Sequence, residues 1–161
     1  MAEHRIVASK KRVRFSPIAL YNLKGGFSSM NTENRDREEG LSLKLNFDKM
    51  GGILPAIVQD FNTGNILMLG YVNKEALEET LRTNYATFWK PYVNTLWRKG
   101  EDSGNRLSVL RVLVDCDQDA LVYQVEAEGK IVCDTIDRSG NERQSCFYRK
   151  IIVGKTELAS I

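Results

Sequence analysis

Two runs with the alternation of β-strands flank a short acidic segment, and this arrangement most restricts the fold of the chain. RLSVLRVLV (106–114) and ALVYQVEAEG (120–129) alternate apolar and polar residues, a pattern typical of strands with one buried face. The residues between them are DCDQD (115–119). Together with similar runs elsewhere in the chain, they predict a mainly antiparallel sheet.

Turn and capping signals predict the remaining elements. ILPAIVQDFNTGNILMLGYV (53–72) predicts a hairpin with its turn at 62–64. Asn73 is placed to cap the N-terminus of a helix over 74–84. Its predicted apolar stripe consists of Ala76, Leu77, Thr80 and Leu81. Further strands are predicted over 41–47, 86–92, 95–100, 131–136 and 146–153. The predicted fold class is therefore α+β, mainly antiparallel sheet with one clear helix.

The composition indicates one globular domain in a reducing compartment. The chain has 161 residues, 42% hydrophobic and 27% charged, which suits a single domain with an ordinary core. No apolar run approaches the roughly 20 residues needed to span a membrane, and the N-terminus lacks the apolar region of a secretory signal. Three cysteines, an odd number, argue against a disulfide framework. We therefore expect a cytoplasmic protein.

The N-terminal segment differs from the rest in charge. Residues 1–29 hold six basic residues and one acidic residue. Such a segment is typical of a disordered tail, an organellar targeting sequence, or an arm for nucleic acid or a membrane surface. An over-long gene start is a further alternative, since translation could also begin at Met30. We favour disorder or an over-long start, divide the chain into a tail (1–40) and a domain (41–161), and expect no nucleic-acid or membrane partner.

The acidic segment combines hard and soft metal ligands. In a strand, Asp115, Asp117 and Asp119 would share one face, where their mutual repulsion favours a raised pKa or a bound cation. Cys116 would face the other way, so the segment could contact a hard metal through oxygen and a soft one through sulfur. A solvated acidic turn is the plainer alternative. An EF-hand is disfavoured because Ala120 stands where its loop needs Gly and because the flanks are strands.

Three cysteines could supply a catalytic zinc site. Cys133 follows Cys116 by 17 residues and Cys146 follows Cys133 by 13, a spacing that matches no compact zinc-finger pattern. Three unrelated core thiols are therefore an open alternative. Three protein ligands are nevertheless typical of catalytic zinc, which keeps a fourth position for water.

LWRKGEDSGN (96–105) has the composition of a nucleotide contact. Trp97 offers a stacking face, Lys99 a positive charge, and Ser103 and Gly104 hydrogen-bond donors. This combination suits a phosphorylated aromatic ligand. The alternative is an ordinary basic hairpin end with a core Trp.

The clusters in this order resemble the phosphoribosyl-AMP cyclohydrolase family of histidine biosynthesis, from about 46 to 149. The motifs that carry the resemblance are PAIVQD, GNILMLGYVNKEAL, LWRKGEDSGN, DCDQDAL and SCFYR. The resemblance implies a monofunctional enzyme that opens the N1–C6 bond of the adenine ring of phosphoribosyl-AMP. It also implies an intertwined homodimer that binds Zn²⁺ and Mg²⁺.

The resemblance implies a role for each candidate residue of this chain. Cys116, Cys133 and Cys146 would be the zinc ligands, drawn from two subunits. Asp115, Asp117 and Asp119 would hold magnesium, and Trp97, Lys99, Glu101, Ser103 and Gly104 would bind substrate. A deaminase is excluded, since the H-x-E…P-C-x-x-C signature is missing.

The chain departs from the family pattern in three places. Asp134 stands where the family has a His after the second cysteine, and the only histidine is His4. General acid–base catalysis would then fall to Asp134, another carboxylate or water, and we assign it to Asp134. The loop 136–144 is longer than in the family. Lys90-Pro91-Tyr92 replaces a Ser-Arg-Ser segment, so its phosphate contact would pass to Lys90 or to Arg138 and Arg143. Loss of the His leaves a second hypothesis open, a metal-binding paralogue that binds a nucleotide without turnover.

Overall fold

The computed structural model describes residues 38–129 and 131–161. The predicted tail covers residues 1–40, of which 1–37 lie outside the described residues. Within the described part of the chain, no helix has the length and hydrophobicity needed to cross a bilayer.

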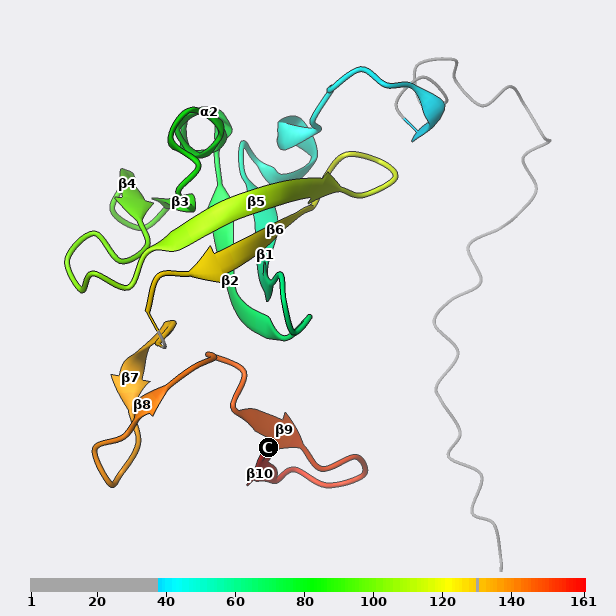
Figure 1. The fold of residues 1–161 in the computed structure, drawn as a ribbon. Coiled ribbons are helices and arrows are strands. Elements are labelled where there is room, and N and C mark those ends of the chain that lie inside the picture. Colours follow the sequence, from blue (N-terminus) through cyan, green and yellow to red (C-terminus); the bar gives the residue numbers. More distant parts are fainter. Residues whose placement is uncertain (1–37, 130) are drawn as a thin grey trace, which may run out of the picture. The chain divides into compact units, whose positions relative to one another are not determined.

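A four-stranded sheet forms the centre of the described fold (Figure 1). Its strands are β1 (Leu54–Asp60), β2 (Ile66–Val72), β5 (Leu107–Val114) and β6 (Leu121–Ala127), in the order β2-β1-β6-β5. β1 pairs with β2 and β5 pairs with β6 in antiparallel fashion, whereas β1 and β6 run parallel. The predicted α+β class with mainly antiparallel pairing is confirmed, and so is the hairpin.

The helix α2 (Lys74–Thr83) begins where the capping signal predicts. The Asn73 side-chain oxygen accepts the N–H of Ala76 at 2.8 Å. Ala76, Leu77 and Thr80 are buried, as predicted. Leu81 is 53% exposed, so its place in the stripe was wrong. A helix turns about 100° per residue, which puts Leu81 at the border of the buried face.

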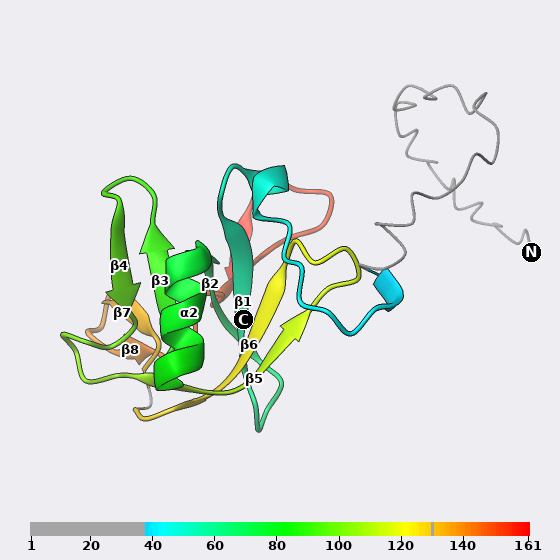
Figure 2. The same cartoon turned by 90° about the horizontal axis from the view of Figure 1, so that it is seen from above.

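A hairpin of β3 (Thr87–Lys90) and β4 (Thr95–Arg98) lies next to α2 (Figure 2). This pair was predicted, and its register places Phe88 opposite Trp97. The guanidinium of Arg98 donates to the Glu79 carboxylate at 2.7 Å, which ties the hairpin to the helix. The hairpin and the helix therefore cover the same side of the sheet.

Two small hairpins follow the sheet. One pairs β7 (Cys133–Ile136) with β8 (Glu142–Arg143), and the other pairs β9 (Arg149–Ile151) with β10 (Leu158–Ser160). The strands predicted over 131–136 and 146–153 are therefore present but shorter. The N–H of Cys146 donates to the Leu67 carbonyl at 2.8 Å and attaches the second segment to β2.

The strand predicted over 41–47 is absent. The segment has a bend at 41–42 and no regular structure over 43–46, and a short 3-10 helix, η1 (Phe47–Met50), begins at its last residue. Lys44 N–H donates to the Gln118 side chain and Asn46 N–H to the Gln118 carbonyl, both at 2.7 Å. Because both contacts reach one residue of a loop, they cannot extend into a strand ladder.

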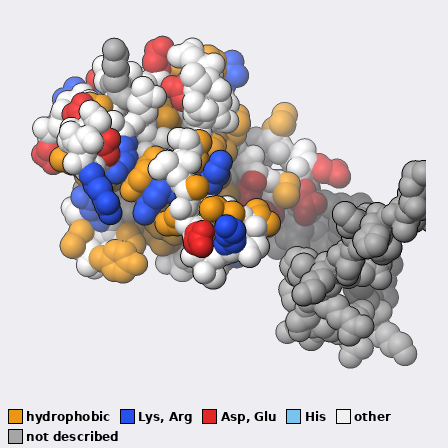
Figure 3. All heavy atoms as spheres, turned by 90° about the horizontal axis from the view of Figure 1, so that it is seen from below, with side chains coloured by type: hydrophobic (Ala, Val, Ile, Leu, Met, Phe, Trp, Pro, Cys, Tyr) orange, Lys and Arg blue, Asp and Glu red, His pale blue; other side chains and the backbone are white. Residues whose placement is uncertain are grey.

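One face of the central sheet is buried and the other is open. In β1, Leu54, Ala56 and Val58 are fully buried beneath α2 and the β3–β4 hairpin. Ile57 on the opposite face is 37% exposed, and Tyr71 of β2 is 40% exposed. Seen from below, on the side of β7–β10, hydrophobic side chains are exposed beside basic ones (Figure 3).

Gly70→Ala is expected to destabilise the fold. An added Cβ would lie 2.6 Å from Cε1 of Phe88, whose ring is 1% exposed and packs between Trp97 and Tyr123. Because this ring has no room to withdraw, we expect a loss of about 1–3 kcal/mol in the free energy of unfolding. Urea denaturation measures this loss.

Val93→Ala is the matched control, since Val93 is 65% exposed on the same hairpin. Its free energy of unfolding should change by less than about 0.5 kcal/mol. A Gly70→Ala variant as stable as this control would contradict the close packing of Phe88 on β2.

Candidate metal and substrate sites

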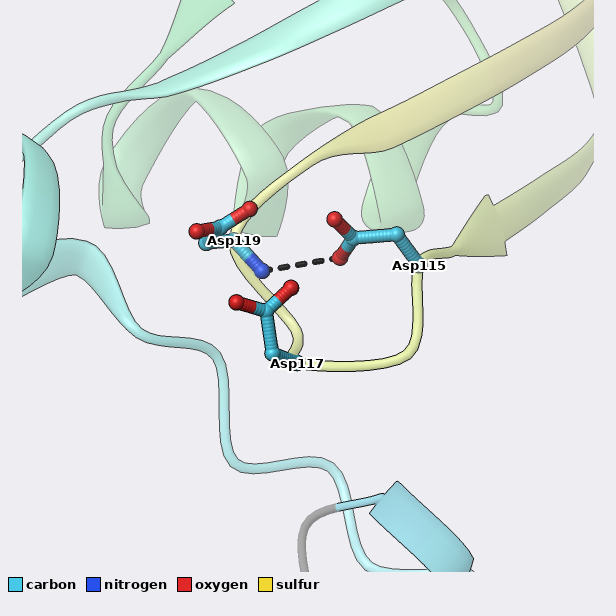
Figure 4. Close-up of side chains that lie close together, drawn as sticks. All are labelled: Asp115, Asp117 and Asp119. Carbon is cyan, nitrogen blue, oxygen red and sulfur yellow. Dashed lines mark hydrogen bonds between the residues drawn. The ribbon is translucent and has the colours of Figure 1, made fainter. Parts of the chain in front are cut away.

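The acidic segment forms a tight loop between β5 and β6, so the predicted strand geometry was wrong. Asp115 organises the loop, because its Oδ1 accepts the N–H of Asp119 at 2.9 Å and that of Ala120 at 3.0 Å. Gln118 adopts the left-handed conformation with φ of 57°, which reverses the chain. The three aspartates are brought together by this turn and not by strand alternation (Figure 4).

The three carboxylates converge closely enough to share one cation. One oxygen from each of Asp115, Asp117 and Asp119 lies within 4.8 Å of the others. Oxygen-only donors on a partly exposed loop suit a hard divalent ion such as Mg²⁺. Within the described part of the chain, this is the one group of three or more His, Cys, Asp or Glu side chains that could hold a metal.

A lysine that the sequence analysis missed lies in this cluster. Lys49 of η1 places its ammonium 2.6 Å from Oδ2 of Asp117 and pairs with Asp119 as well. Its hydrogen bond to Asp117 raises the pKa of Lys49 above its ordinary value, and the same bond lowers the pKa of Asp117. The cluster thus contacts a cation from its own chain, and no local sequence signal links residues so far apart.

Two of the three cysteines lie together at the start of β7 and before β9. Burial opposes the ionisation of Cys133, but hydrogen bonds with Thr135 and Cys146 outweigh it and lower the pKa of the Cys133 thiol. Burial, with the nearby Cys133, raises the pKa of Cys146 to about 11. The two thiols therefore differ in acidity, and sulfur donors of this kind suit Zn²⁺.

Cys116 does not join this thiol pair within one chain. It is exposed in the acidic loop, and the three cysteines form no metal-sized group among the described residues. A hollow of about 350 Å³ lies beside it, lined among others by Leu43, Asp115 and Gln118. The expected zinc ligation by all three cysteines, with ligands from two subunits, stays a prediction.

Lys99 and Asp134 form an ion pair beside the thiol pair. Lys99 is 1% exposed, and its Nζ contacts Oδ1 of Asp134, the residue after Cys133. A buried ammonium is stable only with such a partner. The Lys99 ammonium also lies 5.5 Å from the centre of the Trp97 ring. The predicted roles of Asp134 in catalysis and of Lys99 in substrate binding stay predictions.

The other predicted substrate contacts lie in the turn after β4. Glu101, Ser103 and Gly104 are exposed, and Gly104 N–H donates to the Gly100 carbonyl at 2.9 Å. Gly100 has φ of 79° and lies against the backbone of Asn105, so the turn requires glycine there. The turn is compact and open to solvent, and its substrate contacts stay predictions.

Lys49→Gln is expected to tighten the binding of divalent cations at the acidic loop. The variant removes an ammonium that competes for Asp117 and Asp119. Isothermal titration with Mg²⁺ should show roughly fivefold higher affinity, the size of one such charge contact in water.

Lys74→Gln is the control, because Lys74 pairs with Glu78 on α2 at 3.8 Å and touches none of the aspartates. Its Mg²⁺ affinity should equal that of the unmodified protein. Equal or weaker affinity in Lys49→Gln would show that Lys49 does not compete for the site.

Comparison with known proteins gives consistent matches to one family. A sequence model described as Phosphoribosyl-AMP cyclohydrolase matches residues 68–148, which include Trp97, Lys99, the acidic loop and all three cysteines. A phosphoribosyl-AMP cyclohydrolase of Solibacter usitatus is 43% identical over 117 residues, 73% of this chain and 88% of the relative. That of Cenarchaeum symbiosum is 46% identical over 109 residues, 68% of this chain and 94% of the relative.

A longer relative aligns over only part of its length. The histidine biosynthesis bifunctional protein HisIE of Thermus thermophilus is 44% identical over 117 residues, 73% of this chain but 51% of the relative.

Proposed function

The chain belongs to the phosphoribosyl-AMP cyclohydrolase family, enzymes of histidine biosynthesis, and we propose that it hydrolyses the N1–C6 bond of the adenine ring of phosphoribosyl-AMP. The observation that carries this proposal is the pair of donor sets in the matched region. One set consists of three converging carboxylates and the other of two thiols in contact, Cys133 and Cys146. A two-metal hydrolase requires a hard and a soft cation site, and in this chain the acidic loop and the thiol pair would meet only across two copies, because Cys116 lies apart from Cys133 and Cys146 within one chain.

The donor sets fit the expected metals. Asp115, Asp117 and Asp119 would hold Mg²⁺, for which their oxygens are suitable ligands. Cys133 and Cys146 would hold Zn²⁺ with Cys116 of a second copy of the chain. Zinc, when bound, supplies a Lewis acid that makes water nucleophilic at neutral pH.

A homodimer would complete the zinc site. One chain leaves Cys116 apart from the thiol pair, and it also leaves apolar surface uncovered. On the open sheet face, Leu69 and Leu113 are each 44% exposed, and Ile151 of β9 is 71% exposed. An apolar surface of this kind is typical of an interface. Dimerisation would then cover the sheet and supply the third thiolate at the same time.

The residues of this chain would position the substrate and accept a proton during the reaction. Trp97 would stack on the purine, while Glu101, Ser103 and Gly104 would hydrogen-bond to the ribosyl groups. Asp134, adjacent to Cys133 and 65% exposed at its side chain, would accept the proton of the attacking water. Lys99 would hold that carboxylate in place from beneath.

Turnover of phosphoribosyl-AMP tests the proposal directly. We expect protein loaded with Zn²⁺ and Mg²⁺ to open the adenine ring, which a change in ultraviolet absorbance measures. A chelator should abolish the reaction. A folded protein with stoichiometric zinc and no turnover would contradict the proposal. That result would favour the metal-binding paralogue, whose supporting observation is Asp134 in place of the family's His.

Asp134→Asn is expected to lose about 100-fold or more in kcat while keeping zinc, since general acid–base groups contribute roughly this much. Zinc content by mass spectrometry and the melting temperature separate lost chemistry from lost structure. Full activity in this variant would remove Asp134 from the mechanism. Glu142→Gln, which alters an exposed acid of β8 in the same hairpin, is the control and should retain activity.

A further inference from the structure

An aromatic cleft of about 370 Å³ lies between β2 and the β3–β4 hairpin. Its lining includes Tyr71, Phe88, Trp89, Lys90, Tyr92 and Trp97. Among these, Trp97 is a predicted substrate contact and Lys90 is one of the alternatives for the phosphate contact. The cleft is therefore a feature that the proposed catalytic residues do not explain.

The geometry of the hairpin explains how the cleft forms. Side chains alternate along a strand, so Phe88 and Lys90 of β3 share a face with Trp97 of β4. Gly70 on β2 has no side chain, which lets the Phe88 ring lie against the strand backbone. The floor of the cleft is thus apolar, and Trp97 forms part of its wall.

Lys90 places a positive charge in this aromatic surrounding. Its ammonium lies 4.7 Å from the centre of the Trp97 ring, a cation–π contact. Within the described part of the chain, Lys90 forms no ion pair with an acidic side chain. The charge is therefore available for an anionic group of a ligand.

Arg143, one of the two arginines that were the alternative phosphate contacts, is already engaged. Arg143 donates to the Thr135 hydroxyl at 2.8 Å and to the Ile136 carbonyl, and its guanidinium lies 4.0 Å from the Tyr148 ring centre. Lys90 has the cation–π contact alone. The structure therefore favours Lys90 over Arg143 as the phosphate contact.

The cleft is connected to the thiol pair through one residue. Lys99 lies 5.5 Å from the Trp97 ring centre on one side and pairs with Asp134 on the other. Asp134 directly follows Cys133. A planar base against Trp97 would thus lie next to the residues proposed to carry out the reaction.

We propose that this cleft binds the purine nucleoside monophosphate part of the substrate, with the base against the aromatic side chains and a phosphate at Lys90. Aromatic faces stack on any purine, and an ammonium recognises phosphate as a point charge. This assignment rests on the proposed function, because it names the part of the substrate that the same site holds. It gives this chain's Lys90-Pro91-Tyr92 segment a binding role.

Intrinsic fluorescence can report on this cleft alone. The chain has two tryptophans, Trp89 and Trp97, and both line the cleft. The experiment titrates the full chain, loaded with Zn²⁺ and Mg²⁺, with AMP and with adenosine. We expect saturable quenching by both probes and about tenfold tighter binding of AMP, because only AMP offers a phosphate to Lys90.

Two variants separate the phosphate contact from the base contact. Lys90→Gln should weaken AMP about tenfold and leave adenosine unchanged. Tyr92→Ala should weaken both probes, and since Tyr92 is fully exposed the fold should survive. Lys74→Gln, an exposed lysine on α2, should change neither affinity.

Turnover measured on the same variants separates this inference from the proposed function. Suppose that the unmodified protein turns over substrate and that Lys90→Gln has the same KM and the same affinity for AMP. This result would overturn the cleft assignment and leave the proposed cyclohydrolase activity intact. If AMP binding depends on Lys90 but the unmodified protein shows no turnover, the cleft assignment is supported and the proposed cyclohydrolase activity is contradicted. Quenching that depends on protein concentration and not on nucleotide would show that a second copy of the chain covers the cleft, and would also overturn the assignment.

Discussion

The ion pair between Lys99 and Asp134 is the contact on which the arrangement of the candidate site depends. It joins the end of β4 to the start of β7, two segments separated by 35 residues. The ammonium of Lys99 is almost completely buried, so it requires this partner, while the Asp134 side chain still reaches solvent. Because Asp134 follows Cys133, the same contact holds the thiol pair near Trp97. One ion pair thus stabilises the buried Lys99 ammonium and fixes the position of the exposed Asp134 carboxylate.

The acidic loop concentrates negative charge that the chain itself only partly offsets, and the thiol pair lies near a positive charge. Three carboxylates share the β5–β6 loop with one ammonium from Lys49. At the thiol pair, the positive charge of Arg143 lowers the pKa of Cys133 in addition to the hydrogen bonds. Like charges in a small volume favour a bound cation. The two sites differ in donor chemistry, oxygen in one and sulfur in the other, which allows two different metals to be held separately.

Local signals in the sequence predicted most of the fold. The hairpin turn at 62–64, the cap at Asn73 and the strands β5 and β6 depend on residues close in the chain, and the structure confirms all of them. Burial alternates along β6, whereas a bulge between Val109 and Arg111 interrupts the alternation of β5. The strand predicted over 41–47 is absent, because the backbone N–H groups of Lys44 and Asn46 bond to Gln118 of the β5–β6 loop. Leu81 was misplaced because a stripe read from sequence does not define where the packed face ends.

The candidate site could be predicted in its residues but not in its contacts. The motifs indicated Asp115, Asp117 and Asp119, yet the turn that gathers them was taken for a strand. The pairing of Lys49 with the acidic loop spans 68 residues, and no periodicity or capping pattern encodes such a distance. The aromatic cleft likewise depends on how β2 packs against the hairpin, a tertiary feature.

The central claim is that two copies of the chain build each zinc site, and co-expression of two defective variants tests it most directly. Cys116→Ser and Cys146→Ser would each lose zinc and turnover as homodimers. In hybrid dimers, one site would contain Cys116 from one copy and Cys133 with Cys146 from the other, all intact. The account predicts recovery of about a quarter of the wild-type zinc content and turnover, as random pairing in a twofold dimer requires. No recovery in folded hybrid dimers would contradict it.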